Sequence, residues 1–233
     1  MRETLVVHIE HSSRKVLQLA EVAFPLGLSG TVELPFTRTA LRNCFNDDGK
    51  IVQRPGFTQI SSNTLVARGA FEWNGGLYAV ASQSLIKITD ITTGSYSVIG
   101  AITGTSDIRT ANGFNTAVIV VRGGALYTLD KSDTLVDISG SSNIVPCDSV
   151  TLIDGRFLYI PTDGSVAFFS DVGAAATVQA SSFFDAEQLP DNNNESYQLN
   201  NVLYIAGDNS TQSFTNQGTS PVPFRAQTGR VDV

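Results

Sequence analysis

Cysteine and histidine are scarce in this sequence, which contains two residues of each. Two cysteines are too few for the disulfide framework of a small secreted domain, so we expect Cys44 and Cys147 to be buried free thiols in a reducing compartment. The histidines, His8 and His11, form a His-x-x-His pair that no cysteine or aspartate cluster joins, which argues against a metal site. Ser-His-Asp catalysis would need one of them, and no Gly-x-Ser-x-Gly motif is present.

Charge is also sparse, at 16% of residues against about 25% in an average globular protein. The net charge is −7. An acidic chain gains little from counterion release on DNA, so tight nucleic-acid binding is disfavoured, whereas a wall along which DNA slides without sticking is compatible with this charge. No stretch approaches the roughly 20 apolar residues of a membrane span, and no secretory signal is evident at the N-terminus. We therefore expect neither membrane insertion nor secretion.

What the sequence does contain is a repeat. "WNGGLYAV" begins at Trp73, and related stretches follow as "RGGALYTL", "DGRFLYIP" and "LNNVLYIA". Each places a tight polar turn before Leu-Tyr and an extended apolar run. The tyrosines, at positions 78, 127, 159 and 204, are 49, 32 and 45 residues apart. Four-stranded propeller blades repeat at roughly 40–50 residues, so the spacing indicates a β-propeller.

The segments around each repeat are typical of antiparallel meanders. Short alternating strands are separated by turn pairs such as Asp154-Gly155 and Asn200-Asn201, and helical periodicity is absent across residues 65–216. A β-sandwich or jelly roll also has strands every 8–12 residues, but neither predicts the longer self-similar period. The predicted fold class is all-β, a β-propeller or partial β-propeller with an N-terminal extension.

The chain divides into residues 1–34, an N-terminal hairpin extension with an irregular linker, and residues 35–233, the propeller blades. Residues 4–24 alternate around a polar "HSSRK" turn and favour a hairpin over a helix starting near Ser13. "NDDGK" predicts a second hairpin turn, with glycine supplying a positive φ.

Several polar groups have the residue types of catalytic or metal-binding sites. Propeller glycosidases use paired carboxylates, and Asp107, Asp148, Asp171, Asp185 and Glu187 could supply a pair, but no spacing singles one out. "NDDGK" and "PDNNNE" are oxygen-rich, yet neither matches a calcium loop, and turn chemistry explains both. We expect no catalytic, cofactor-binding or metal-binding residues.

The order of several motifs resembles the phage stabilisation protein family, the tail hub or tail accessory factors of short-tailed phages. The residues that carry the resemblance are 43–45 ("NCF"), 54–57 ("RPGF"), Arg68-Gly69 and 76–80 ("GLYAV"), and it extends over residues 35–233. Residues 1–24 fall outside it, and the chain is about half the usual length of a member. "PVPFRAQTGRVDV" resembles an internal blade junction.

This resemblance implies a structural virion protein assembled in the bacterial host cytoplasm and located in the tail. It would form a hexameric ring below the portal and adaptor, contact the needle or tailspike and fibre proteins, extend the DNA channel and retain packaged DNA, which passes through only as cargo. The alternative is a propeller glycan-binding protein or glycosidase acting on the host surface. Genomic neighbours would separate a virion protein from a bacterial propeller of other function.

Three structural expectations follow. Leu77, Leu126, Leu158 and Leu203 should be mostly buried, with the preceding glycine or asparagine positions in hairpin turns. A surface that faces a DNA channel should be acidic or neutral. The open end of the propeller should be closed either by N-terminal strands within residues 32–36 and 51–60 or by blades from another polypeptide, and the second is favoured.

Overall fold

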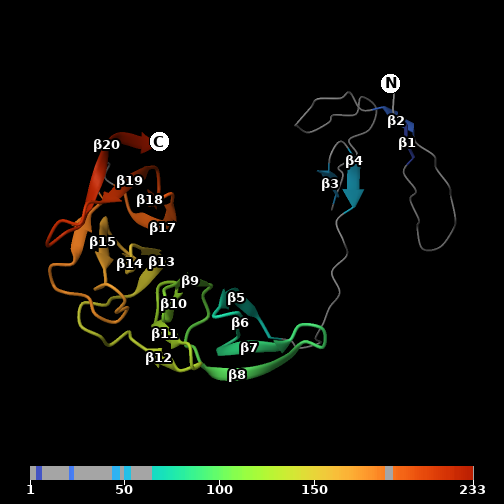
Figure 1. Cartoon of the computed structure of the whole chain (residues 1–233), viewed down its shortest axis with the longest axis horizontal. Coiled ribbons are helices and arrows are strands. Elements are labelled where there is room, and N and C mark those ends of the chain that lie inside the picture. The colour runs from blue at the N-terminus through green and yellow to red at the C-terminus, as the bar shows by residue number, and fades with distance from the viewer. Residues whose placement is uncertain are drawn as a thin grey trace. The chain divides into compact units, whose positions relative to one another are not determined.

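The computed structural model describes the backbone of residues 4–6, 21–23, 44–47, 50–53, 65–186 and 191–232, with side chains for 65–186 and 191–227. The chain separates into two units, Met1–Thr58 and Gln59–Val233. Each is described by itself (Figure 1). The part of the chain that the structure describes is all-β, as predicted, and contains no helix that could cross a membrane.

The described residues of the first unit form two antiparallel strand pairs. β1 (Thr4–Val6) pairs with β2 (Glu21–Ala23), which agrees with the predicted hairpin rather than a helix, although the residues between these strands lie outside the described part. β3 (Cys44–Asp47) pairs with β4 (Lys50–Gln53) on either side of Asp48-Gly49, as the "NDDGK" pattern predicts. His8 and His11 lie outside the described residues.

The second unit contains four antiparallel sheets of four strands each, connected as simple meanders, which we call blades 1 to 4. Blade 1 comprises β5 (Ala67–Trp73), β6 (Gly76–Ala81), β7 (Ser84–Asp90) and β8 (Ser95–Ala101). Blade 2 comprises β9 (Ile108–Asn112), β10 (Thr116–Val121), β11 (Leu126–Asp130) and β12 (Leu135–Asp137). Blade 3 comprises β13 (Cys147–Ile153), β14 (Arg156–Pro161), β15 (Val166–Phe169) and β16 (Phe183–Asp185). Blade 4 comprises β17 (Asn193–Leu199), β18 (Val202–Gly207), β19 (Thr211–Asn216) and β20 (Phe224–Asp232).

Tight turns between first and second strands form where the sequence predicts them. Asn74, Asp154 and Asn200 all have positive φ values, near 50°, and the residue after each is also left-handed. Two successive left-handed residues make the two-residue turn whose twist matches a β-hairpin, and asparagine, aspartate and glycine adopt it at the lowest cost. These turns therefore fix the strand register of blades 1, 3 and 4.

Blade 2 departs from the predicted repeat. The Gly123 turn joins its second and third strands, so its Leu-Tyr pair lies on β11, whereas the other three pairs lie on second strands. The second strands begin at Gly76, Thr116, Arg156 and Val202, which are 40, 40 and 46 residues apart. The uneven intervals of the tyrosines arose because the motif recurs at two different hairpins of the blade, and the structural period is more regular.

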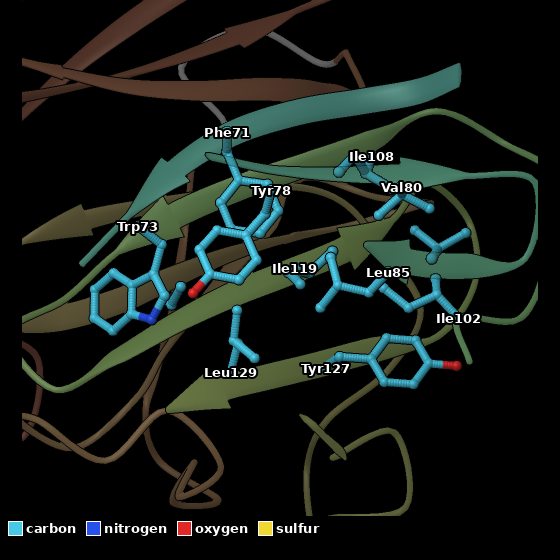
Figure 2. Close-up of a cluster of buried hydrophobic side chains, with 12 residues drawn as sticks. Phe71, Trp73, Tyr78, Val80, Leu85, Ile102, Ile108, Ile119, Tyr127 and Leu129 are labelled. Atoms are coloured by element: carbon cyan, nitrogen blue, oxygen red, sulfur yellow. The ribbon is translucent and has the colours of Figure 1, made fainter. Parts of the chain in front are cut away.

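The cores lie between successive blades. The cluster between blades 1 and 2 joins Tyr78, Val80 and Leu85 to Ile119 and Leu129 (Figure 2). Equivalent clusters fill the spaces between blades 2 and 3 and between blades 3 and 4. Burying such side chains stabilises each interface by roughly 1.5–3 kcal/mol per large residue, so packing between blades holds this unit together.

One of the four leucine predictions is wrong. Leu126, Leu158 and Leu203 are fully buried, but Leu77 is 40% exposed. In blade 1 the tyrosine side faces blade 2 and buries Tyr78, while the leucine side is the outer face of the first blade. The motif predicts the strand, but the neighbouring blade decides which side of the strand is buried.

Candidate functional site

The concave side of the second unit is formed by the first strand of each blade. β5, β9, β13 and β17 lie next to one another in that order, and Figure 1 shows the later strands of each sheet farther out. A ligand or polymer passing along the axis of the blades would meet this surface first. We call it the inner rim.

Close packing of the inner rim depends on a glycine. A Cβ atom at Gly69 on β5 would lie 2.5 Å from Cγ1 of Ile108 on β9, so the Ile108 side chain or the strand would have to move. The absence of a side chain lets the first strands of blades 1 and 2 approach. This explains the glycine of the Arg68-Gly69 motif.

Arg68 connects blade 1 to the segment that leads into blade 2. Its Nε donates to the Ser106 carbonyl at 2.7 Å, Nη1 donates to the carbonyls of Ser82 and Ile102, and Nη2 donates to that of Thr103. The residue is 6% exposed, and burial lowers the pKa of its guanidinium. The arginine therefore satisfies carbonyls of two loops at once and has a structural role.

An ion pair crosses the inner rim. Arg109 on β9 donates from Nε to Oε2 of Glu195 on β17 at 2.9 Å, and from Nη1 to Oδ2 of Asp107 at 2.7 Å. Ser149 on β13 donates to the other oxygen of Glu195 at 2.6 Å. The hydrogen bond to Glu195 raises the pKa of Arg109. The pair thus joins blades 2 and 4, with blade 3 contributing the serine between them.

Buried hydroxyls continue this network between blades 3 and 4. The Ser196 backbone N–H donates to Oγ of Ser149 at 3.1 Å, and Oγ1 of Thr151 donates to the Ser196 carbonyl at 2.6 Å. The Ser196 hydroxyl in turn bonds that of Thr151 at 3.0 Å. Because each hydroxyl has a partner, these polar groups add directional contacts to an interface that is otherwise apolar.

The accessible charges of the inner rim are mainly acidic. Glu72, Asp148 and Glu195 stand against Arg109, and the one other charged residue of these strands, Arg68, is buried. The accessible charge of the inner rim is therefore acidic to neutral. It gives a phosphate backbone nothing to bind tightly.

The candidate carboxylates for glycosidase chemistry lie on different parts of the unit. Asp107 precedes β9, where it binds Arg109, and Asp148 lies on the first strand of blade 3. Asp171 follows β15 and accepts a hydrogen bond from Gln179, while Asp185 is on β16, the fourth strand. Glu187 lies outside the described residues. Among the residues with described side chains, no three His, Cys, Asp or Glu residues gather as a metal site.

The described part of "PDNNNE" shows turn chemistry, as predicted. Asp191 accepts the backbone N–H of Asn209 at 2.9 Å and the Ser210 hydroxyl, and Asp208 accepts from Asn194. The carboxyl oxygens of Asp191 therefore accept hydrogen bonds from the loop itself. The side chains of "NDDGK" lie outside the described part.

Cys147 is 1% exposed and free, which confirms the prediction for this thiol, and burial raises its pKa to about 12. The side chain of Cys44 lies outside the described part. A thiol with so high a pKa is a poor nucleophile at neutral pH.

The two ends of the row of blades present different outer faces. On blade 1 this face carries Leu77 and Val98, which are 40% and 63% exposed. On blade 4 it carries Tyr197, 45% exposed and stacked on Tyr204 at 5.0 Å, together with Leu199, 56% exposed. These faces were expected from the open propeller, but which residues line them depends on strand register.

Sequence reasoning did not anticipate the inner-rim pairing of Arg109 with Glu195. These residues are far apart in the sequence and no motif marks either of them. Arg68, in contrast, was part of a recognised motif, although its partners could not be read from the sequence. Long-range partners of this kind require the spatial order of the blades.

Residues 34–231 match the model of a protein family described as "Bacteriophage P22 Gp10, beta-propeller". No curated protein matches the chain in a direct sequence comparison.

Solved propeller structures share the fold at low sequence identity. Virginiamycin B lyase from Staphylococcus aureus superposes with a TM-score of 0.53 at 12% identity, covering 82% of this chain and 64% of the lyase. A streptogramin B lyase gives a TM-score of 0.50 at 12% identity, covering 71% and 55%. The extracellular domain of BT4673 from B. thetaiotaomicron gives 0.50 at 12% identity, covering 76% and 23%. The chain spans less than two thirds of each of these structures, and the likeness concerns the fold alone.

Proposed function

The chain belongs to the phage stabilisation family, and on that premise we propose that it forms part of the tail hub or nozzle ring of a short-tailed phage, below the portal and adaptor. In this position it extends the DNA channel and retains packaged DNA, without catalysis. The observation that carries the proposal is the family match over residues 34–231.

The inner rim supports a passive channel wall. Its accessible charges are Glu72, Asp148 and Glu195 against Arg109, and Arg109 is already bound to Glu195. A duplex passing this surface finds no free cluster of cations. Contacts with the portal, the adaptor and the needle or fibre proteins, and assembly as a ring in the host cytoplasm, are part of the same proposal.

The primary test removes the protein from the phage. A nonsense mutation in its gene should give particles that fill with DNA and then lose it, and supplying the chain in trans should restore retention. Nuclease sensitivity of the packaged genome, together with electron microscopy of the tails, measures this. Particles that keep their DNA and infect without the protein would show that the assignment is wrong.

A second test asks whether the inner rim faces the DNA. The inner variant Glu72→Lys/Asp148→Lys adds positive charge to first strands. The matched outer variant, Asp137→Lys/Asp185→Lys, makes the same change in charge on fourth strands. We expect the inner variant alone to slow DNA ejection and to bind duplex DNA with a steeper salt dependence. Nanomolar duplex binding by the unaltered chain at physiological salt would contradict a passive wall.

A further inference from the structure

The first hairpin turn of blade 2, between β9 and β10, differs from those of the other three blades. Blades 1, 3 and 4 use two residues each, Asn74-Gly75, Asp154-Gly155 and Asn200-Asn201. Blade 2 uses three residues, 113–115, with the sequence Gly-Phe-Asn. In repeat proteins, residues added to one repeat lie in loops, and such loops often form the binding face. The added residue in blade 2 brings a phenylalanine into a turn that is otherwise polar.

Phe114, in this turn, is 86% exposed, more than any other large hydrophobic residue with a described side chain. Blade 2 has a described blade on each side, so this exposure does not depend on where the described row of blades begins or ends. A single exposed hydrophobic residue is ordinary on a protein surface. Val172, which is 63% exposed, lies against Gly155 in the first hairpin turn of blade 3, and the Phe114 turn adjoins the same hairpin. Two exposed apolar residues therefore adjoin one hairpin of an internal blade.

The turn that carries Phe114 is held by both neighbouring blades. The side-chain amide of Asn112 donates to the Glu72 carbonyl of blade 1 at 2.7 Å. A Cβ atom at Gly113 would lie 2.7 Å from Cζ of Phe157 in blade 3, so the turn packs closely on that ring. An exposed side chain on a backbone that is already fixed loses little conformational freedom when it binds, which favours its use as an anchor.

Lys131 lies over the exposed ring. Its Nζ is 4.3 Å from the ring centroid of Phe114, within the range of a cation–π contact. Lys131 is in the turn between β11 and β12, and Asp130 holds this turn by accepting the backbone N–H groups of Ser132 and Thr134. Among the residues with described side chains, no carboxylate lies within ion-pair distance of Lys131. The ammonium therefore lies beside the ring with its charge unpaired.

A partner that covers the ring also covers this ammonium. A buried cation without an anionic partner costs far more free energy than burial of one ring provides. We propose that Phe114 and Lys131 form a docking site for another virion protein, which supplies an apolar pocket for the ring and a carboxylate for the lysine. This inference rests on the proposed function and gives the chemistry of one partner surface within it.

The surrounding charges favour a protein over nucleic acid or lipid. Single-stranded nucleic acid also binds aromatic and lysine side chains, but it needs a positively charged groove, and anionic lipid needs a basic cluster. Lys131 is the one cation of its turn, which also contains Asp130 and Asp133, and the neighbouring hairpin turn of blade 3 contributes Asp154. A phosphate-rich partner would meet these carboxylates, whereas a protein can place its own carboxylate on Lys131 alone.

Photo-crosslinking in phage particles tests the proposal. The nonsense mutant is supplied with chains that carry p-benzoylphenylalanine in place of Asn115, next to Phe114. In the control, the crosslinker replaces Asp163, in the second hairpin turn of blade 3, at the opposite end of the strands. We expect position 115 to give a covalent product with one other virion protein, identified by mass spectrometry, and position 163 not to give that product.

Substitutions measure what each residue contributes. Phe114→Asp and Lys131→Glu should each lower the yield of the product from position 115 about 10-fold or more, as loss of an interface anchor does. Phe114→Tyr and Lys131→Arg keep the ring and the charge and should retain most of the product. Val136→Asp, at a 49% exposed position on the outer strand of the same blade, is the matched control and should leave the yield unchanged.

A stability measurement separates loss of contact from loss of fold. Because the Phe114 side chain lies in water, purified Phe114→Asp should unfold in urea at the same midpoint as wild type. A fall in crosslinking without a change in this midpoint therefore reports the contact itself.

Several results would overturn the inference. A product with a second copy of the chain would mean that like surfaces pair, and a product with DNA would mean that the site binds nucleic acid. An unchanged yield in Phe114→Asp would show that the ring is no anchor. Particles that contain the chain and keep their DNA but give no product from position 115 would contradict this inference alone. Particles that lack the chain even when wild type is supplied would contradict the proposed function as well.

Discussion

Blades 2 and 3 and the end blades 1 and 4 are built from the same strand pattern, but their side chains are buried differently. Phe157 and Leu77 occupy the same position of a second strand, counted from the first hairpin turn, yet Phe157 is 1% exposed and Leu77 is 40% exposed. The difference arises because blade 3 has a neighbour on each side and blade 1 has one. Strand formation is thus a local property, whereas burial belongs to the interface between blades.

The largest loss of stability is expected at Phe157, which packs between blades 2 and 3 and is 1% exposed. Replacing it with alanine leaves a large cavity, and we expect Phe157→Ala to lower the free energy of unfolding by about 3–5 kcal/mol. Phe183→Ala, on the fourth strand of blade 3 and 44% exposed, is the matched control and should cost about 1 kcal/mol or less. Urea denaturation measures both, and equal losses would contradict the interface model.

A substitution at Arg68 tests the junction between blade 1, an end blade, and blade 2, an internal blade. Arg68→Met keeps the length of the side chain but leaves the carbonyls of Ser82, Ile102, Thr103 and Ser106 without their donor. We expect a loss of about 2–4 kcal/mol. Arg225→Met, on the exposed surface of blade 4, serves as the control and should have little effect. Thermal denaturation measures both variants. A melting temperature of Arg68→Met equal to that of wild type would show that Arg68 has no structural role.

The contact between Tyr78 of blade 1 and Asp133 of blade 2 should make this junction sensitive to acid. Burial alone would raise the pKa of Asp133, but hydrogen bonds from Lys87 and Tyr78 outweigh burial, and the pKa is lowered. The ionised form therefore stabilises the fold above the ordinary range of an aspartate, and this contribution is lost as pH falls through the lowered pKa.

Asp133→Asn should accordingly cost about 1 kcal/mol at neutral pH and flatten the acid limb of the stability curve. Denaturant titrations at a series of pH values give this curve. Asp137→Asn, on the exposed fourth strand of blade 2, is the control. An unchanged acid limb in Asp133→Asn would show that other carboxyls determine it.

The smallest effect is expected at the end face. Leu77→Ala should lower the free energy of unfolding by about 1 kcal/mol or less, because the side chain is already partly in water. Leu203→Ala, at the equivalent but fully buried position of blade 4, should cost about 2–5 kcal/mol. Urea denaturation measures both variants, and a similar cost at both sites would mean that Leu77 is covered within the chain.

The sequence allowed the all-β fold, the hairpin turns and the burial of three of the four motif leucines to be predicted. Asparagine, aspartate and glycine determine turns locally, so Asn74-Gly75 and Asn200-Asn201 could be placed without a structure. The side of blade 1 that is buried could not be predicted, because it depends on where the next blade lies. The displaced motif of blade 2 was missed for a related reason, since its turn residues suit either hairpin.

The candidate site followed the same division. An acidic or neutral inner surface could be expected from composition and the family resemblance. The pairing of Arg109 with Glu195 could not, because it joins side chains from blades 2 and 4, whose distance from each other depends on how blade 3 lies between them.

That pairing has a mechanical consequence. Arg109 on blade 2 and Glu195 on blade 4 lie on the concave side, and Ser149 of blade 3 is hydrogen-bonded to the same carboxylate. The ion pair therefore links three blades on their inner side. Opening the angle between these blades stretches the Arg109–Glu195 ion pair, whereas bending the row of blades further compresses the packed first strands. The ion pair therefore resists a decrease in the curvature of the row of blades, and the packing of the first strands resists an increase. Because the ion pair is partly exposed, dissolved salt weakens it but leaves the packing unchanged. Resistance of the blades to opening should therefore fall as ionic strength rises.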